Sequence, residues 1–103
     1  PYTRGDVIMS LYFFAEHMGY DLSESADLSS FKDVGDLDNT TGIQPPNYNN
    51  QREFMPMEDY WSWAVGCGII DGYPDGTLSQ NNYVTRAEFA KMLCKFIDYY
   101  NVQ

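Results

Sequence analysis

Two arginines occupy matching places in an internal repeat of the chain. Residues 3–6 read Thr-Arg-Gly-Asp, and residues 85–88 read Thr-Arg-Ala-Glu. An arginine in the first turn of a helix is disfavoured by the helix dipole by about 0.3 to 1 kcal/mol, so starting a helix does not call for one. An arginine fork beside the free N–H groups of a helix N-terminus is, however, well suited to hold a carboxylate. We therefore interpret Arg86 and Arg4 as candidate ligands of an anionic group.

The other members of the repeat have a structural interpretation as well as a binding one. Thr85 with Glu88, and the Thr of the first copy with Asp6, are spaced as capping boxes, in which two residues satisfy each other's backbone N–H groups at the start of a helix. Either arginine can likewise be held by an acid of this chain, such as Asp33 or Asp71. At the level of the sequence, both interpretations stay open.

Aromatic side chains near these motifs could contact a ligand, because they combine a large apolar area with a polar group. Trp61 is spaced for the buried face of a helix. Trp63 and Tyr73 fit either a core or a binding cleft. We keep Trp63 and Tyr73 as candidate ligand contacts beside the arginines.

Catalysis and metal binding find little support in the sequence. His17 is the only histidine and has no Ser or Cys motif beside it, so a nucleophilic triad is unsupported. The acidic turn 71–82 resembles a calcium loop but ends in Asn rather than the required carboxylate. Cys67 and Cys94 are not spaced as metal ligands and are interpreted as buried thiols or an internal disulfide. We expect a protein that is not an enzyme and has no metal or cofactor.

The composition limits the class of partner. With 15 acidic and 6 basic residues the net charge is −9, and such a chain repels the phosphate backbone of nucleic acids. No run approaches the roughly 18 apolar residues of a membrane helix, so we expect no membrane insertion. An anionic ligand would have to bind at a local, partly desolvated arginine site, since long-range attraction is lacking.

Hydrophobic periodicity predicts three helices joined by two long irregular segments. The apolar residues Val7, Leu11, Phe14 and Met18 follow the spacing of one helical face, which Gly19 ends, and the stripe Phe89, Leu93, Phe96, Ile97 predicts the last helix. The expected order is a helix from Arg4 to Met18, a polar connector, a loop insertion over about 35–56, a helix from Met57 to Gly66–Gly68, a turn at 71–77, and a helix from Arg86 to Tyr100. Gly72 and Gly76 are residues that can take positive φ in that turn.

A series of motifs along the chain resembles the S-layer homology family. The series consists of Phe31-Lys32-Asp33-Val34, Trp63-Ala64-Val65, Gly68-Ile69-Ile70, Gly72-Tyr73-Pro74-Asp75-Gly76-Thr77 and Val84-Thr85-Arg86-Ala87-Glu88-Phe89. The ordered set is far more specific than any one piece. The resemblance implies a mainly α fold, with residues 1–19 as the terminal helix of a preceding repeat and residues 20–103 as one repeat. In the family, repeats occur in threes and form a pseudo-threefold helical bundle.

The resemblance also implies a function and a location. Members of this family anchor exported proteins to the bacterial cell wall by binding secondary cell-wall polysaccharide, often one that carries pyruvate ketals. We therefore expect an extracellular, non-catalytic, glycan-binding module, or alternatively a structural or assembly module that uses the inserted loop for protein contacts. Because the chain supplies little more than one repeat, we also expect self-association or exposed apolar surface. The candidate glycan-binding residues are Arg86, Arg4, Thr85, Glu88, Asp6, Asp33, Asp71, Gly72, Tyr73 and Trp63.

Overall fold

Both predicted capping boxes form, and each starts a helix. The hydroxyl of Thr3 accepts from the backbone N–H of Asp6 at 3.1 Å, and the Asp6 carboxylate accepts from the N–H of Thr3. Thr85 and Glu88 repeat the arrangement at the start of the last helix. Each pair satisfies two N–H groups that would otherwise lack an intrahelical partner, which sets the first residue of both helices.

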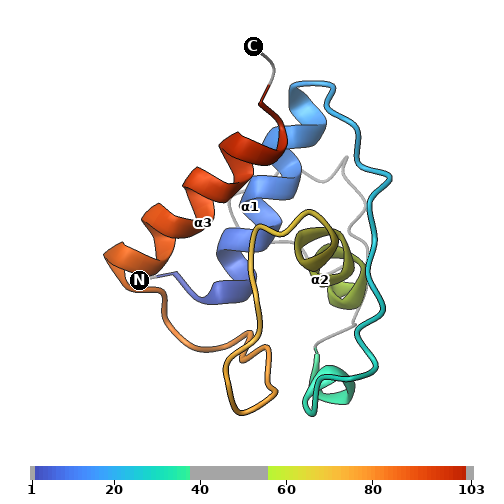
Figure 1. Ribbon diagram of the computed structural model, residues 1–103, viewed down its shortest axis with the longest axis vertical. Helices are drawn as coiled ribbons and strands as arrows, with labels where there is room; N and C mark the ends of the chain where they lie inside the picture. Colours follow the sequence, from blue (N-terminus) through green and yellow to red (C-terminus); the bar gives the residue numbers. More distant parts are fainter. Residues whose placement is uncertain (1, 38–55, 102–103) are drawn as a thin grey trace, which may run out of the picture.

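The computed structural model describes residues 2–37 and 56–101 (Figure 1). Its elements are α1 (Arg4–His17), the 3₁₀ turn η1 (Val34–Asp36), α2 (Met57–Gly66) and α3 (Arg86–Tyr99). Within the described ranges there is no β-strand, and extended pairing is limited to a bridge between Thr3 and Tyr83. The mainly helical class predicted from the sequence is confirmed. Most of the predicted insertion at 35–56 lies outside the described residues.

Glycines end the first two helices in the same way. Gly19 and Gly68 both have φ of 75°, a conformation that glycine adopts without the steric cost of a Cβ. In each case the residue after the glycine donates its N–H back into the last turn, from Tyr20 to Ala15 and from Ile69 to Ala64. These bonds satisfy carbonyl groups that the helix end leaves free, and they turn the chain sharply away from the helix.

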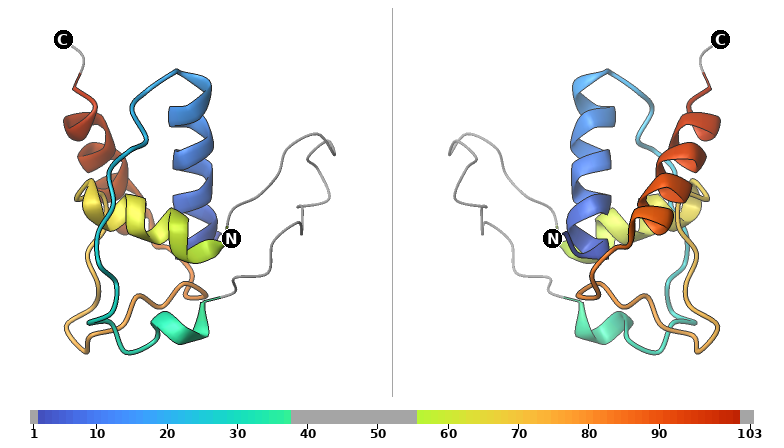
Figure 2. Two further views of the ribbon diagram at one scale, coloured as in Figure 1. Left: turned by 90° about the vertical axis from the view of Figure 1, so that its right-hand side faces the viewer. Right: turned by 90° about the vertical axis from the view of Figure 1, so that its left-hand side faces the viewer.

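The three helices surround an aromatic core. Helices α1 and α3 run side by side, and α2 crosses the direction of α1 (Figure 2). Tyr60, Trp61 and Trp63 on α2 are almost fully buried, and the ring of Tyr12 meets both Tyr60 and Trp63 edge-on with centroids 5.1 Å apart. Edge-to-face contacts of this kind add to the free energy gained by burying the rings. Trp63 is therefore a core residue.

Residues 69–84 form an irregular segment, at the bottom of Figure 1, that packs against the residues that follow α1. The Asp33 carboxylate accepts from the N–H groups of Leu78 and Ser79, each at 2.8 Å. Gly76 has a positive φ of 86°, whereas Gly72 does not. A Cβ at Gly72 would lie 2.4 Å from the ring of Phe31, and this close approach is what requires glycine there.

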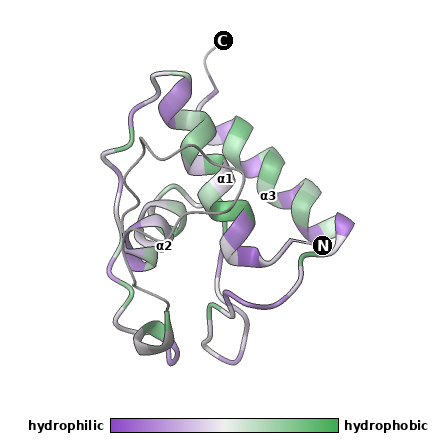
Figure 3. Cartoon of the chain, turned by 180° about the vertical axis from the view of Figure 1, so that it is seen from behind, coloured by the Kyte–Doolittle hydropathy of each residue, from purple (hydrophilic) through white to green (hydrophobic). Residues whose placement is uncertain are grey.

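Part of the predicted core stripe is exposed. Phe14, Phe89, Leu93 and Ile97 were expected to face the core, but between about a third and a little more than half of each side chain is exposed. The hydropathy colouring shows apolar segments of α1 and α3 beside one another (Figure 3). The periodicity was correct, but the described chain supplies too few elements to cover both helices.

Three smaller expectations can be compared with the structure. Cys67 is buried as expected, whereas Cys94 is exposed, and both are free thiols rather than a disulfide. No helix in the described ranges is long and apolar enough to cross a membrane. Nor do the described residues include a group of three His, Cys, Asp or Glu side chains placed to hold a metal ion.

Candidate functional site

Arg4 lies at the centre of the candidate site and is buried despite its charge. Only 4% of the residue is exposed. Its Nε donates to the carbonyl of Leu78 at 2.9 Å, and its Nη2 donates to the carbonyl of Asp71 at 3.1 Å. Its Nη1 lies 3.3 Å from the carboxylate of Glu88. A buried cation needs such partners, because removing the charge from water is costly.

Two aromatic rings add to the surroundings of this guanidinium. The Cζ atom of Arg4 lies 4.2 Å from the ring centroid of Tyr73 and 5.8 Å from that of Trp61. Both distances are within the range in which a cation is attracted to the face of an aromatic ring. The segment 69–80, together with α2, therefore holds Arg4 in one orientation.

Glu88 connects the three parts of the site. Its carboxylate accepts from the backbone N–H of Thr85, from the Tyr73 hydroxyl and from Arg4. These partners lower the pKa of Glu88, with the Thr85 backbone hydrogen bond as the largest cause, while burial partly opposes the shift. The carboxylate is consequently ionised at neutral pH and keeps Arg4 and Tyr73 in place.

A pocket of about 270 Å³ opens beside Arg4. It lies between the start of α1, the segment 69–73 and one side of α3. Its lining residues are Arg4, Ile69, Ile70, Asp71, Gly72, Tyr73, Glu88, Lys91, Met92 and Lys95. The pocket thus combines an apolar wall with three cationic and two carboxylate side chains.

Lys91 and Lys95 were missed by the sequence analysis. They lie one turn apart on α3, on the side away from its apolar stripe, and Lys95 contacts Asp71 at 3.3 Å. With Arg4, they place three of the chain's six basic residues at one pocket. Their spacing of four residues on a predicted helix was a usable signal, but a flank of a helix does not reveal what packs beside it.

The structure brings together half of the predicted site residues. Arg4, Asp71, Gly72, Tyr73 and Glu88 line the pocket. The remaining candidates, Arg86, Thr85, Asp6, Asp33 and Trp63, do not.

Each of those five has another place in the fold. Trp63 is in the core, where its Nε1 donates to the Tyr100 hydroxyl at 3.0 Å. Asp33 and Thr85 bind backbone N–H groups, and Asp6 caps α1. Arg86 is exposed at the start of α3. The two repeat arginines therefore lie in opposite environments rather than at one site.

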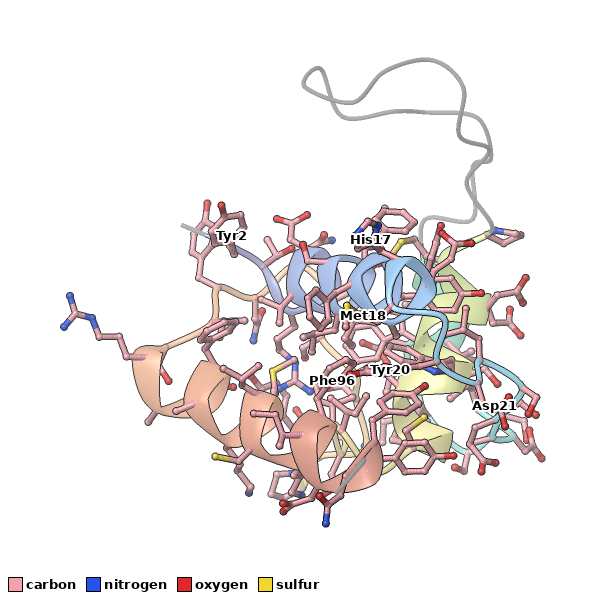
Figure 4. The ribbon with its side chains drawn as sticks, turned by 90° about the horizontal axis from the view of Figure 1, so that it is seen from above. Tyr2, His17, Met18, Tyr20, Asp21 and Phe96 are labelled. Atoms are coloured by element: carbon pink, nitrogen blue, oxygen red, sulfur yellow. The ribbon has the colours of Figure 1, made fainter. Side chains whose placement is uncertain are left out.

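A second hollow of about 500 Å³ lies between α1 and α3 and has a different character. The view from above shows Phe96 projecting from α3 into the space between the two helices (Figure 4). The lining residues are Tyr2, Val7, Ser10, Leu11, Phe14, Phe89, Leu93, Phe96 and Ile97. None of them carries a charge, so this α1–α3 groove is suited to apolar contact rather than to an ionic ligand.

Comparison with known protein families gives one match. Residues 55–90 match the family model of the S-layer homology domain. This match covers about a third of the chain and supports the S-layer homology assignment predicted from the sequence. The matched range includes Asp71, Gly72, Tyr73 and Glu88 of the pocket, whereas Arg4 and the two lysines lie outside it. No curated protein and no solved structure was found to match the chain.

The family assignment gives the coarse function. S-layer homology domains are non-catalytic modules that associate proteins with the bacterial cell wall or cell surface. The pocket beside Arg4 combines a buried guanidinium, two lysines, two carboxylates and an apolar wall. A pocket of this composition offers both ionic and apolar contacts.

Proposed function

We propose that this domain anchors its parent protein by binding an anionic cell-wall polysaccharide in the pocket beside Arg4. The observation that carries the proposal is the gathering of Arg4, Lys91 and Lys95 at one pocket of a chain whose net charge is −9. These three cations exceed the two carboxylates of the pocket, Asp71 and Glu88, by one charge, so the pocket has a net charge of about +1. A local excess of this kind can favour an anionic group that the chain as a whole would repel.

Arg4 retains the capacity to bind a ligand. A guanidinium has five N–H groups, and the contacts to Leu78, Asp71 and Glu88 use one on Nε and one on each terminal nitrogen. One N–H on each terminal nitrogen remains for a ligand oxygen. Because its orientation is already held by protein groups, little side-chain entropy is lost when a ligand carboxylate binds.

The sugar portion of the ligand would contact the apolar wall. Ile69, Ile70 and Met92 line the pocket beside the half-buried Tyr73. A pyruvate ketal joins a carboxylate and a methyl group to a sugar ring, so it would present both kinds of surface at once. We infer that a pyruvylated secondary wall polysaccharide is the preferred polymer, and that residues 1–19 and 20–103 belong to successive repeats that share this pocket.

Titration calorimetry with purified pyruvylated wall polymer tests the proposal. Replacing Lys91 and Lys95 by Ala removes two pocket charges at positions that leave the core intact, and we expect affinity to fall by about tenfold or more. Lys32→Ala is the matched control, since Lys32 is an exposed lysine that does not line the pocket.

Removing the pyruvate groups from the polymer should weaken binding by the unmodified chain to a similar degree. Equal affinity for both polymers would reject the pyruvate ketal as the recognised group. Equal affinity of the double lysine variant and the unmodified chain would reject the pocket itself.

An assembly role is the second candidate. The assembly role was predicted from the inserted loop, and most of that loop lies outside the described residues. The α1–α3 groove independently favours protein contacts. Deleting residues 38–53 should abolish association with a partner if the loop carries that role. Association that survives the deletion would assign protein contacts to another surface.

A further inference from the structure

The two copies of the internal repeat present the same helical face, but only one copy is covered. Arg4, Ile8 and Ala15 of α1 are buried, and Arg4 donates hydrogen bonds to the segment 69–80. Their counterparts on α3 are Arg86, Ala90 and Ile97, and all three are exposed. Ala15 is fully buried, whereas 57% of Ile97 is exposed. A face that is built for burial in one copy is left open in the other.

The open face is continuous with the α1–α3 groove. Phe89, Leu93 and Ile97 follow one another at intervals of four residues, so they form a ridge along α3. The same three residues line the groove that separates α3 from α1. This helix therefore supplies both a ridge and one wall of a groove beside it, which is the requirement for a surface that is complementary to itself.

We propose that a second copy of this chain covers the groove, with α3 of each copy lying antiparallel in the groove of the other. Such a contact is isologous, because the same residues are used on both sides of a twofold axis. Leu93 lies near the middle of α3 (Arg86–Tyr99), so antiparallel pairing brings the two Leu93 side chains to the axis. It also places Phe89 of each copy against Ile97 of the other.

Arg86 supports a second copy and the antiparallel direction. It is exposed at the N-terminus of α3, where the positive end of its own helix dipole disfavours it. The last turn of α3 has no basic residue and contains Asp98. Antiparallel pairing brings Arg86 of each copy to the negative end of the other α3, whereas parallel pairing would place the two arginines together.

The net charge does not oppose this arrangement at the contact itself. None of the groove residues is charged, although each copy carries a net charge of −9. The acidic side chains would remain around the contact, so we expect the dimer to be stronger at higher salt, where repulsion is screened. An unrelated partner would have to supply a matching apolar ridge, which this chain already contains.

The proposed dimer leaves the wall-polymer pocket open. Glu88, Lys91 and Lys95 line that pocket from the other side of α3. Two pockets per dimer would raise the apparent affinity for a polymer with repeated anionic groups, because the second binding event becomes intramolecular. Dimer formation itself does not depend on polymer binding, so each proposal can fail separately.

Sedimentation equilibrium of the full 103-residue chain, without polymer, tests the dimer. We expect a monomer–dimer equilibrium, and Leu93→Glu should weaken it by about a hundredfold or more because a charge would be buried at the axis. Tyr83→Glu is the control, since Tyr83 is 67% exposed and does not line the groove. Arg86→Glu should weaken the dimer by about threefold or more.

Circular dichroism should show native helix content in every variant. A chain that stays monomeric at all concentrations, or a dimer that Leu93→Glu leaves intact, would overturn the proposal.

Cysteine cross-linking tests the direction of the helices. In a Cys94→Ser background, oxidised Leu93→Cys should form covalent dimers. Phe89→Cys alone should not, because the two sites would lie about 12 Å apart along the antiparallel helices.

A mixture of the Phe89→Cys and Ile97→Cys chains should cross-link again. Efficient dimers of Phe89→Cys alone would contradict the antiparallel arrangement.

Discussion

The guanidinium of Arg4 lies 3.3 Å from the carboxylate of Glu88, and this contact joins the first copy of the internal repeat to the second. Arg4 belongs to the start of α1 and Glu88 to the start of α3. The Glu88 carboxylate simultaneously caps α3 and accepts from Tyr73. One ion pair therefore couples the orientation of two helices to the shape of the candidate pocket.

Replacing Arg4 should destabilise the chain strongly. In Arg4→Met, the carbonyls of Leu78 and Asp71 lose their side-chain donor and Glu88 loses its cation. We expect the free energy of unfolding in urea to fall by about 2 to 4 kcal/mol. Arg86→Met is the control at the equivalent position, and at monomeric concentrations it should change stability by less than about 0.5 kcal/mol. Similar losses in both variants would contradict the difference in burial.

The contribution of Glu88 to stability should depend on pH. Its pKa is lowered, chiefly by the backbone N–H of Thr85, from an ordinary value of 4.5. A lowered pKa means that the stabilisation is fully present above about pH 4.5 and is lost as the pH falls through the folded-state pKa. The difference in unfolding free energy between the unmodified chain and Glu88→Gln should therefore shrink on acidification. A difference that stays constant from neutral pH to about pH 3 would contradict this assignment.

Gly72→Ala should be destabilising for a steric reason. The added Cβ would lie 2.4 Å from the Phe31 ring and 3.0 Å from the carbonyl of Thr77. We expect a loss of about 1 to 3 kcal/mol, typical of an overpacked site, measured by thermal or urea unfolding. Gly35→Ala is the matched control because a Cβ there meets no atom within 4 Å. If Gly72→Ala left the stability unchanged, the Phe31 ring would have to move aside at little cost in free energy.

Substitutions of Trp63 and Tyr73 should affect the stability of the fold and the affinity for polymer differently. Trp63→Phe removes the donor to Tyr100 and part of a buried ring, so we expect a loss of about 1 to 3 kcal/mol without a change in polymer affinity. Tyr73→Phe removes only the hydroxyl that contacts Glu88, and it should weaken polymer binding with a smaller effect on stability. Unfolding and calorimetric titration of both variants measure the two effects. Reduced affinity in Trp63→Phe would return Trp63 to the candidate site.

Local features of this chain could be predicted from its sequence. The two capping boxes depend on residues three positions apart, and the glycines after α1 and α2 act within one turn, so both are readable without knowledge of distant contacts. The helical periodicity of α1 and α3 was likewise visible. Five of the ten candidate residues line one pocket, because the motif 71–73 and the arginine repeat were both recognised.

The different environments of Arg4 and Arg86 could only come from the tertiary structure. Both arginines follow a capping Thr in the first turn of a helix, and local reasoning treats them alike. Segment 69–80 returns to α1 but not to the matching face of α3, so one arginine is buried and the other is exposed. The same return of the chain places Lys91 and Lys95 beside Arg4. The sequence by itself determined where the helices begin and end, whereas long-range packing decided which arginine faces the pocket, because burial depends on residues far away along the chain.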